Sequence, residues 1–193
     1  MITELKYGNT NTYLIKGTQK YILFDTDWAG TFASFCCAIK EKSVKLCDIE
    51  YLFISHFHPD HMGLAGLLAE KGVKIAVIDL QKDFIHISDR IFQKENNKDY
   101  IPIDETKIIT LKLAESRKFL SDLGISGEII HTPGHSDDSI SVCLDDGTVL
   151  VGDLNPLYEL PFYKDTAVGE SWNKILAKNP RKICYGHAKT TII

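Results

Sequence analysis

The sequence lacks the features that mark exported, membrane-spanning and nucleic-acid-binding proteins. Its first residues contain neither a basic segment nor an apolar stretch of signal length, and no apolar run approaches the length of a membrane span. The 22 Lys and Arg residues are scattered, and with 26 Asp and Glu the formal net charge is -4. Because a nucleic-acid footprint needs a basic face, nucleic acid is not an expected partner. These absences predict a cytoplasmic protein with no membrane partner.

Cysteine is also sparse. The chain has 5 cysteines, an odd number, without C-x-x-C spacing, and most of them lie among apolar residues as buried reduced thiols do, so no disulfide is expected. A chain of 193 residues with 44% hydrophobic residues has room for one domain with a core, so residues 1–193 are predicted to be a single domain. The oligomeric state is left open.

Against this background, three histidines and a carboxylate occur within six positions, at His56, His58, Asp60 and His61. Side chains alternate faces in an extended chain, so His56 and His58 should point the same way at the end of an apolar strand. Pro59 keeps His58 out of helical geometry, which places Asp60 and His61 at the turn into a helix. Imidazole and carboxylate together suit zinc, iron or manganese better than calcium. The stretch therefore predicts a metal site.

Further candidate ligands follow predicted strands in the second half. His135 comes after a Pro-Gly turn, and Asp153 and His187 stand directly beyond apolar strands. His131 is interpreted as bracing the turn by hydrogen bonding, with a metal contact as the alternative. His86 has a predicted surface or packing role because lone histidines rarely bind metals. Asp25, after an apolar strand, needs either a buried partner or a role as a helix cap.

The spacing of apolar residues predicts the secondary structure. It predicts two hairpins and further strands alternating with helices: strands over 11–16, 21–24, 51–54, 73–78, 107–113, 128–130, 139–144, 148–151 and 182–185, and helices over 31–42, 63–71, 84–92 and 171–178. Residues 94–104 and 155–169 are expected to be irregular.

The motifs His56-Phe57-His58-Pro59-Asp60-His61, Thr132-Pro133-Gly134-His135, Val151-Gly152-Asp153 and Tyr185-Gly186-His187 resemble those of the metallo-β-lactamase superfamily. Phe24-Asp25-Thr26 is similar to the buried aspartate turn of that family. The resemblance implies an α/β fold, a four-layer αβ/βα sandwich with metals in a cleft along one edge. It assigns His56, His58 and His135 to one ion, and Asp60, His61 and His187 to another, with Asp153 bridging them.

The resemblance also implies chemistry. His58 stands where the iron oxidoreductases of the superfamily often carry glutamate, which favours a hydrolase. Asp27 and the Asp137-Asp138 pair depart from the family pattern. Both lie in loops that border the cleft in that family, so the resemblance does not identify the substrate. The predicted enzyme is a dinuclear hydrolase, with zinc favoured and iron or manganese as alternatives. A hydroxide bridging the metals would attack a small carbonyl substrate, a thioester or lactone ahead of a β-lactam.

Other residues have predicted roles in this reaction. Asp60 is expected to orient the attacking water or accept its proton. Trp28, Tyr158 and Tyr163 are predicted to contact substrate, as large side chains near ligand-bearing turns. Three alternative functions are an iron-dependent sulfur dioxygenase, a phosphodiesterase, and a metal-binding domain without turnover.

Overall fold

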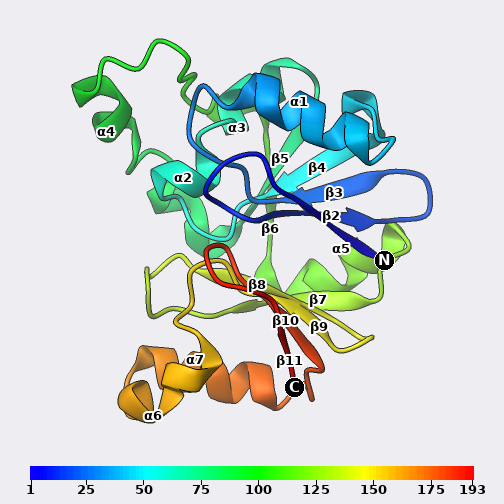
Figure 1. Cartoon of the computed structure of the whole chain (residues 1–193), viewed down its shortest axis with the longest axis vertical. Helices are drawn as coiled ribbons and strands as arrows, with labels where there is room; N and C mark the ends of the chain where they lie inside the picture. The colour runs from blue at the N-terminus through cyan, green and yellow to red at the C-terminus, as the bar shows by residue number, and fades with distance from the viewer.

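The computed structural model describes all of residues 1–193 and contains two β-sheets (Figure 1). The strands are β1 (Ile2–Leu5), β2 (Thr12–Lys16), β3 (Tyr21–Phe24), β4 (Ile49–Phe53), β5 (Lys74–Ile78), β6 (Ile108–Leu111), β7 (Gly127–His131), β8 (Ile140–Leu144), β9 (Thr148–Leu150), β10 (Lys182–Cys184) and β11 (Thr191–Ile192). The helices are α1 (Phe32–Glu41), α2 (Pro59–Met62), α3 (Ala65–Glu70), α4 (Asp89–Lys94), α5 (Ser116–Asp122), α6 (Leu160–Tyr163) and α7 (Ala167–Leu176).

The first sheet has the order β1-β2-β3-β4-β5-β6. Its first three strands are antiparallel neighbours, whereas β3, β4, β5 and β6 run parallel. The second sheet has the order β11-β10-β9-β8-β7, in which only β9 and β10 form a parallel pair. Since parallel strands carry their carboxyl ends to one edge, the loops after β3 and β4 start side by side, as do those after β9 and β10.

Successive side chains along the strands of the first sheet point to opposite faces, and both faces are apolar. In β2, Leu14 belongs to the cluster that includes residues of α1 and α3, whereas Tyr13 and Ile15 belong to the cluster between the sheets. In β4, Leu52 likewise belongs to the helix-covered cluster and Phe53 to the cluster between the sheets. This period of two is the side-chain pattern of a sheet buried on both sides.

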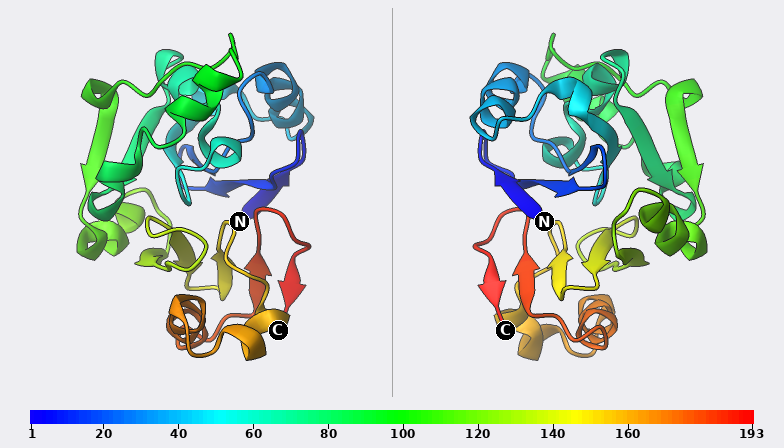
Figure 2. Two further views of the ribbon diagram at one scale, coloured as in Figure 1. Left: turned by 90° about the vertical axis from the view of Figure 1, so that its left-hand side faces the viewer. Right: turned by 90° about the vertical axis from the view of Figure 1, so that its right-hand side faces the viewer.

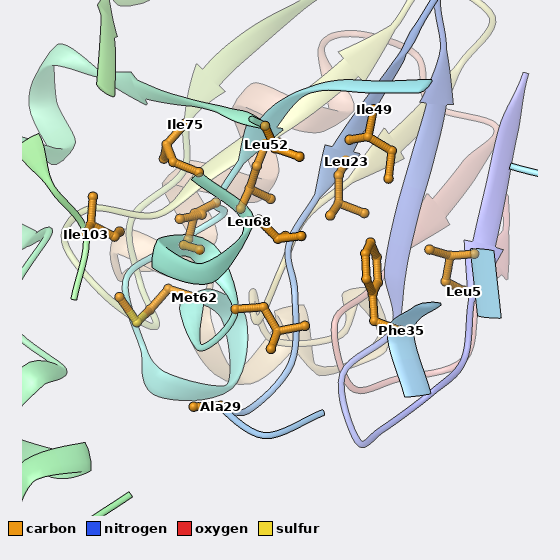
Figure 3. Packing of buried hydrophobic residues seen from close by; sticks show 14 of the residues in the cluster. Leu5, Leu23, Ala29, Phe35, Ile49, Leu52, Met62, Leu68, Ile75 and Ile103 are labelled. Carbon is orange, nitrogen blue, oxygen red and sulfur yellow. The ribbon is translucent and has the colours of Figure 1, made fainter. Parts of the chain in front are cut away.

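The packing clusters define four layers. Helices α1 and α3 cover the outer face of the first sheet (Figure 3), where Phe35 of α1 and Leu68 of α3 meet Leu23 and Leu52. On the outer face of the second sheet, the fully buried Trp172 of α7 packs in one cluster with the strands. Figure 2 shows the resulting order of helices, sheet, sheet and helices. This is the αβ/βα sandwich that the sequence predicted.

The structure corrects several predicted elements. Strands β1 and β11 and helix α5 were not predicted; α5 has the mainly polar sequence SRKFLSD, and only its Phe119 and Leu120 join the core between the sheets. Residues 155–169 are not wholly irregular, because they contain the 3-10 turn Leu157–Glu159 and α6, and α7 starts earlier than predicted. The segment 84–92 is split between a 3-10 turn (Asp79–Phe84) and α4. Short elements such as these carry too few residues for periodicity to register.

All five cysteines are free thiols. Only Cys143 and Cys184 are buried, whereas Cys37 and Cys47 are exposed, so the expectation that most of the cysteines are buried is wrong. None of the helices has the length and apolar character needed to span a bilayer.

The core between the sheets gives a stability prediction. Phe53 is 1% exposed and packs edge-on against Phe119, so Phe53→Ala should lower the free energy of unfolding by about 3–5 kcal/mol through lost burial and the cavity left behind. The control Phe162→Ala removes a ring that is 83% exposed, and its effect should stay within about 0.5 kcal/mol. Urea unfolding followed by circular dichroism compares the two; equal losses would show that Phe53 is not a core residue.

Candidate metal centre

The seven predicted ligand residues lie beyond the carboxyl ends of strands and gather at one edge of the two sheets. His56 and His58 follow β4, Asp60 and His61 lie in α2, His135 follows β7, Asp153 follows β9 and His187 follows β10. In Figure 1 the red loop after β10 lies beside the loop after β9, and the hydrogen bond from Gly186 N to Gly152 O (2.7 Å) joins them. Together the seven residues make up three groups whose possible ligand atoms lie within 4.8 Å of one another.

The first group consists of His56, His58 and His135. His58 Nδ1 lies 3.0 Å from His135 Nε2, and the His56 ring centroid lies 4.5 Å from that of His58. Burial, together with the neighbouring His61, lowers the pKa of His56 well below its usual value, and burial and His135 lower the pKa of His58. Both rings are therefore neutral at physiological pH, which is the form that binds a metal.

The second group consists of Asp60, His61 and His187. His187 Nε2 lies 3.0 Å from Asp60 Oδ2 and 3.3 Å from His61 Nε2. Burial acts to raise the pKa of Asp60, but the hydrogen bond from His187 and the charge of His61 lower it to about 2. Asp60 is therefore ionised at neutral pH.

Asp153 forms the third group with His56 and His61 and stands between the other two. Its Oδ1 lies 3.1 Å from His61 Nε2 and 3.4 Å from His187 Nε2, and its Oδ2 lies 3.6 Å from His135 Nε2. One carboxylate therefore presents one oxygen to each group. Burial alone would lower the pKa of His61, but the carboxylates of Asp25 and Asp153 raise it to about 10. A cation between His61 and Asp153 would supply the same positive charge and displace that proton.

Unsatisfied polar atoms provide a test of whether metal ions fit these residues. His56 Nε2 and Asp153 Oδ1 are buried and have no hydrogen-bond partner, although a ring nitrogen of His61 lies 3.1 Å from Asp153 Oδ1, within ion-pair distance. Buried polar atoms without partners are costly and rare. Since imidazole nitrogen and carboxylate oxygen are ligands of zinc, iron and manganese, the residues fit such cations.

A second set of residues orients these rings. Asp25 is buried and accepts hydrogen bonds from His61 Nδ1 (2.9 Å) and from the backbone nitrogen of Ser55 (2.6 Å), so it serves as a buried partner and not as a helix cap. Ser55 Oγ lies 3.0 Å from His56 Nδ1, and Asn9 O lies 3.2 Å from His187 Nδ1. Hydrogen bonds of this kind fix the ring and its tautomer. The parts played by Ser55 and Asn9 were not predicted from the sequence.

Two polar side chains join the segment that carries His56 and His58 to the loop between β7 and β8 of the second sheet. Asp138 is buried and accepts a hydrogen bond from the backbone nitrogen of Phe57 (2.8 Å). The buried amide of Gln81 donates to the carbonyls of Ile54 (3.0 Å) and Asp138 (3.1 Å). Asp138, which departs from the family pattern, therefore positions the loop that carries His58. Neither contact was predicted, because both join segments far apart in the sequence.

A cavity of about 280 Å³ adjoins the centre and is lined in part by Asp153 and His187. The residues predicted to bind substrate are not among those that line it. Trp28 is half-buried, with its ring 5.2 Å from that of Phe92, while Tyr158 is 76% exposed and Tyr163 packs against the apolar cluster around α7. Their predicted substrate contacts stay predictions.

The remaining two histidines lie outside the three groups. His131 Nε2 donates a hydrogen bond to Asp137 O (2.7 Å), which matches the bracing role predicted for it. His86 is on the surface, with ring nitrogens 3.0 Å from Asp89 and 3.2 Å from Glu105.

Comparison with known proteins identifies the family. A sequence profile of the metallo-β-lactamase superfamily matches residues 5–187. The chain belongs to the metallo-β-lactamase superfamily. It is 31% identical over 155 residues to a probable metallo-hydrolase of Methanocaldococcus jannaschii, covering 79% of this chain and 71% of that protein. The resemblance inferred from the sequence motifs is thereby confirmed.

Two longer relatives are similar over most of the chain. The beta-lactamase-like protein 2 homolog of Drosophila melanogaster is 28% identical over 184 residues, which cover 92% of this chain and 58% of that protein. An atrochrysone carboxyl ACP thioesterase of Emericella nidulans is 25% identical over 169 residues, covering 81% of this chain and 46% of that protein. This superfamily member therefore spans about half the length of these two relatives.

Solved structures agree with the fold. A metallo-beta-lactamase family protein of Thermus thermophilus has a TM-score of 0.75 and 19% identity, covering 99% of this chain and 74% of the other. A protein solved in a di-iron-bound form has a TM-score of 0.72 and 19% identity, covering 100% of this chain and 94% of the other. At these identities the likeness establishes the metallo-β-lactamase fold.

The close packing around Gly186 gives a prediction for metal binding. A Cβ at this position would lie 2.7 Å from Asp153 Oδ1 and 2.8 Å from His61 Cε1, so Gly186→Ala should displace both side chains. We expect metal affinity to fall by about 10–100-fold, as when a residue that orients ligands is changed. Metal retention after dialysis against a graded chelator measures it.

Gly72→Ala is the matched control. A Cβ there meets nothing within 4 Å, but the residue has φ +95°, so the change should cost about 1 kcal/mol of stability and leave metal affinity unchanged. Wild-type metal retention by Gly186→Ala would contradict the packing argument.

Proposed function

We propose that the chain is a hydrolase that binds two divalent cations, with zinc preferred, and cleaves a small thioester or lactone. The observation that carries the proposal is the position of Asp153, whose two carboxylate oxygens face different groups of histidines. Membership of a superfamily with metallo-hydrolase relatives supports the reaction class. The single-domain organisation over residues 1–193 is part of the same proposal.

In this proposal His56, His58 and His135 hold one cation, Asp60, His61 and His187 hold the other, and Asp153 contacts both. When bound, such a pair of cations makes a water molecule acidic enough to attack at neutral pH and polarises the substrate carbonyl.

Asp60 has a second task in the proposed reaction. Its side chain is 32% exposed and its pKa is lowered to about 2, so an ionised carboxylate faces water at the edge of the site. A carboxylate in that state can orient the attacking water and accept its proton.

One relative and the size of the cavity support the substrate class. The relative from Emericella nidulans is an acyl carrier protein thioesterase, and the cavity beside the centre, at about 280 Å³, is of a size for a small acyl group. Iron chemistry is the second candidate, because a protein of the same fold has been solved in a di-iron-bound form. A phosphodiesterase is less compatible with the cavity, since no lysine or arginine lines it.

The number of ions is tested by elemental analysis. Protein reconstituted with zinc and desalted should carry close to two ions per chain, and Asp153→Ala should lose both because its two oxygens face histidines of both proposed cation sites. His86→Ala, which changes a surface histidine outside the groups, should keep both. One ion per wild-type chain, or loss of metal from His86→Ala, would overturn the assignment.

The metal preference is tested under anaerobic conditions. Zinc has no accessible redox change, so a hydrolase should turn over thioesters or lactones in its zinc form without oxygen. A sulfur dioxygenase would instead consume oxygen with a persulfide substrate and be inactive with zinc. Oxygen uptake by the iron form, combined with no hydrolysis by the zinc form over a broad ester panel, would contradict the hydrolase proposal.

A further inference from the structure

The wall of the cavity beside the metal centre carries a charge that the proposed metal sites do not use. Among the lining residues, Asp153 and His187 belong to the groups of possible ligands, whereas Glu159 belongs to none of them. A cation bound by those groups would therefore leave the carboxylate of Glu159 free to act on whatever occupies the cavity. Apart from the cations proposed at Asp153 and His187, the cavity wall has no positive charge from a lysine or arginine.

The side chain of Glu159 has a defined neighbour within the cavity wall. Its Oε2 accepts a hydrogen bond from Asn155 Nδ2 at 3.2 Å, and Asn155 is itself a lining residue. An amide neighbour orients a carboxylate without neutralising it. Glu159 is also only partly buried, so its carboxylate can face both solvent and the cavity.

The backbone that carries Glu159 is anchored to the second sheet and α7. Trp172 Nε1 donates to Asn155 O (2.8 Å), and Tyr185 Oη accepts from the backbone nitrogen of Leu157 (3.2 Å). The backbone nitrogen of Glu159 donates a hydrogen bond to Pro156 O (2.8 Å), and this bond closes the 3-10 turn. Because Trp172 and Tyr185 are buried, these contacts hold the backbone of the turn that carries Glu159 against the second sheet.

We propose that Glu159 is a specificity residue that selects acyl substrates bearing an ammonium group and disfavours those bearing a carboxylate or phosphate. A carboxylate attracts an ammonium group and repels an anion, and these interactions are stronger in a partly enclosed cavity than in bulk water. The proposal rests on the hydrolase function proposed above, and it narrows the substrate from small acyl compounds to cationic ones. The cavity of about 280 Å³ limits the group to a short chain.

The test uses three thioesters that share one leaving thiol and differ only at the end of a short acyl chain, which carries an ammonium, a hydroxyl or a carboxylate. With zinc-loaded protein, kcat/KM should decrease in that order. Glu159→Gln should lower the ratio of ammonium to carboxylate substrate by about tenfold, and Glu159→Asp should keep the wild-type preference. The control Glu41→Gln removes one exposed negative charge from α1 and should leave the ratio unchanged.

A binding measurement separates this proposal from the hydrolase proposal. Amide analogues of the three thioesters resist hydrolysis, and calorimetry of the zinc-loaded protein gives their Kd values directly. One outcome contradicts only the hydrolase proposal: no thioester is hydrolysed, but the wild-type protein binds the ammonium analogue more tightly than the carboxylate analogue, and Glu159→Gln loses this difference. The preference assigned to Glu159 is then supported. An unchanged ratio of Kd values in Glu159→Gln, with the protein folded, overturns the role of Glu159.

Discussion

The buried carboxylate of Asp25 is the contact on which the arrangement of the metal centre depends. By accepting hydrogen bonds from Ser55 N and His61 Nδ1, it ties the end of β3 to the loop after β4 and to α2. A buried carboxylate without such donors would be strongly destabilising. Asp25 makes both contacts from φ +62°, a conformation that aspartate tolerates better than most residues. As a result His61 directs Nε2 toward Asp153, which comes from the second sheet.

Packing of the two sheets against each other positions the remaining candidate ligands. Each contributes loops from neighbouring parallel strands, and backbone hydrogen bonds cross between them, including Ile140 N to Ser55 O at 2.8 Å. Tyr13 of the first sheet donates its buried hydroxyl to Tyr185 O of the second at 2.8 Å. The seven candidate ligand side chains come from four segments of the chain, residues 56–61, 135, 153 and 187. They meet within a few ångströms because the layers that carry them are packed together, although the segments are far apart in sequence.

The residues predicted to be ligands could be singled out in the sequence because their signal is local, and the structure brings them together at one site. His56, His58 and Asp60 occur together after an apolar run, and His187 directly follows another, so strand ends could be identified from a few residues. The family motifs, together with the alternation of apolar residues, gave the sandwich. By contrast, Gln81 and Asp138 act through contacts with distant backbone, and Glu159 acts from a 3-10 turn within a segment expected to be irregular. No spacing rule encodes such long-range contacts, and the substrate contacts predicted for Trp28 and Tyr158, which do not line the cavity, stay predictions.

The central claim is that Asp153 joins two cation sites built from residues of both sheets. Anomalous diffraction from crystals of the zinc-reconstituted protein tests it most directly, because it locates the ions without reference to activity. The account predicts two peaks, one about 2.0–2.1 Å from nitrogens of His56, His58 and His135 and one beside Asp60, His61 and His187, with an oxygen of Asp153 near each. A single peak, or two peaks without Asp153 between them, would contradict it.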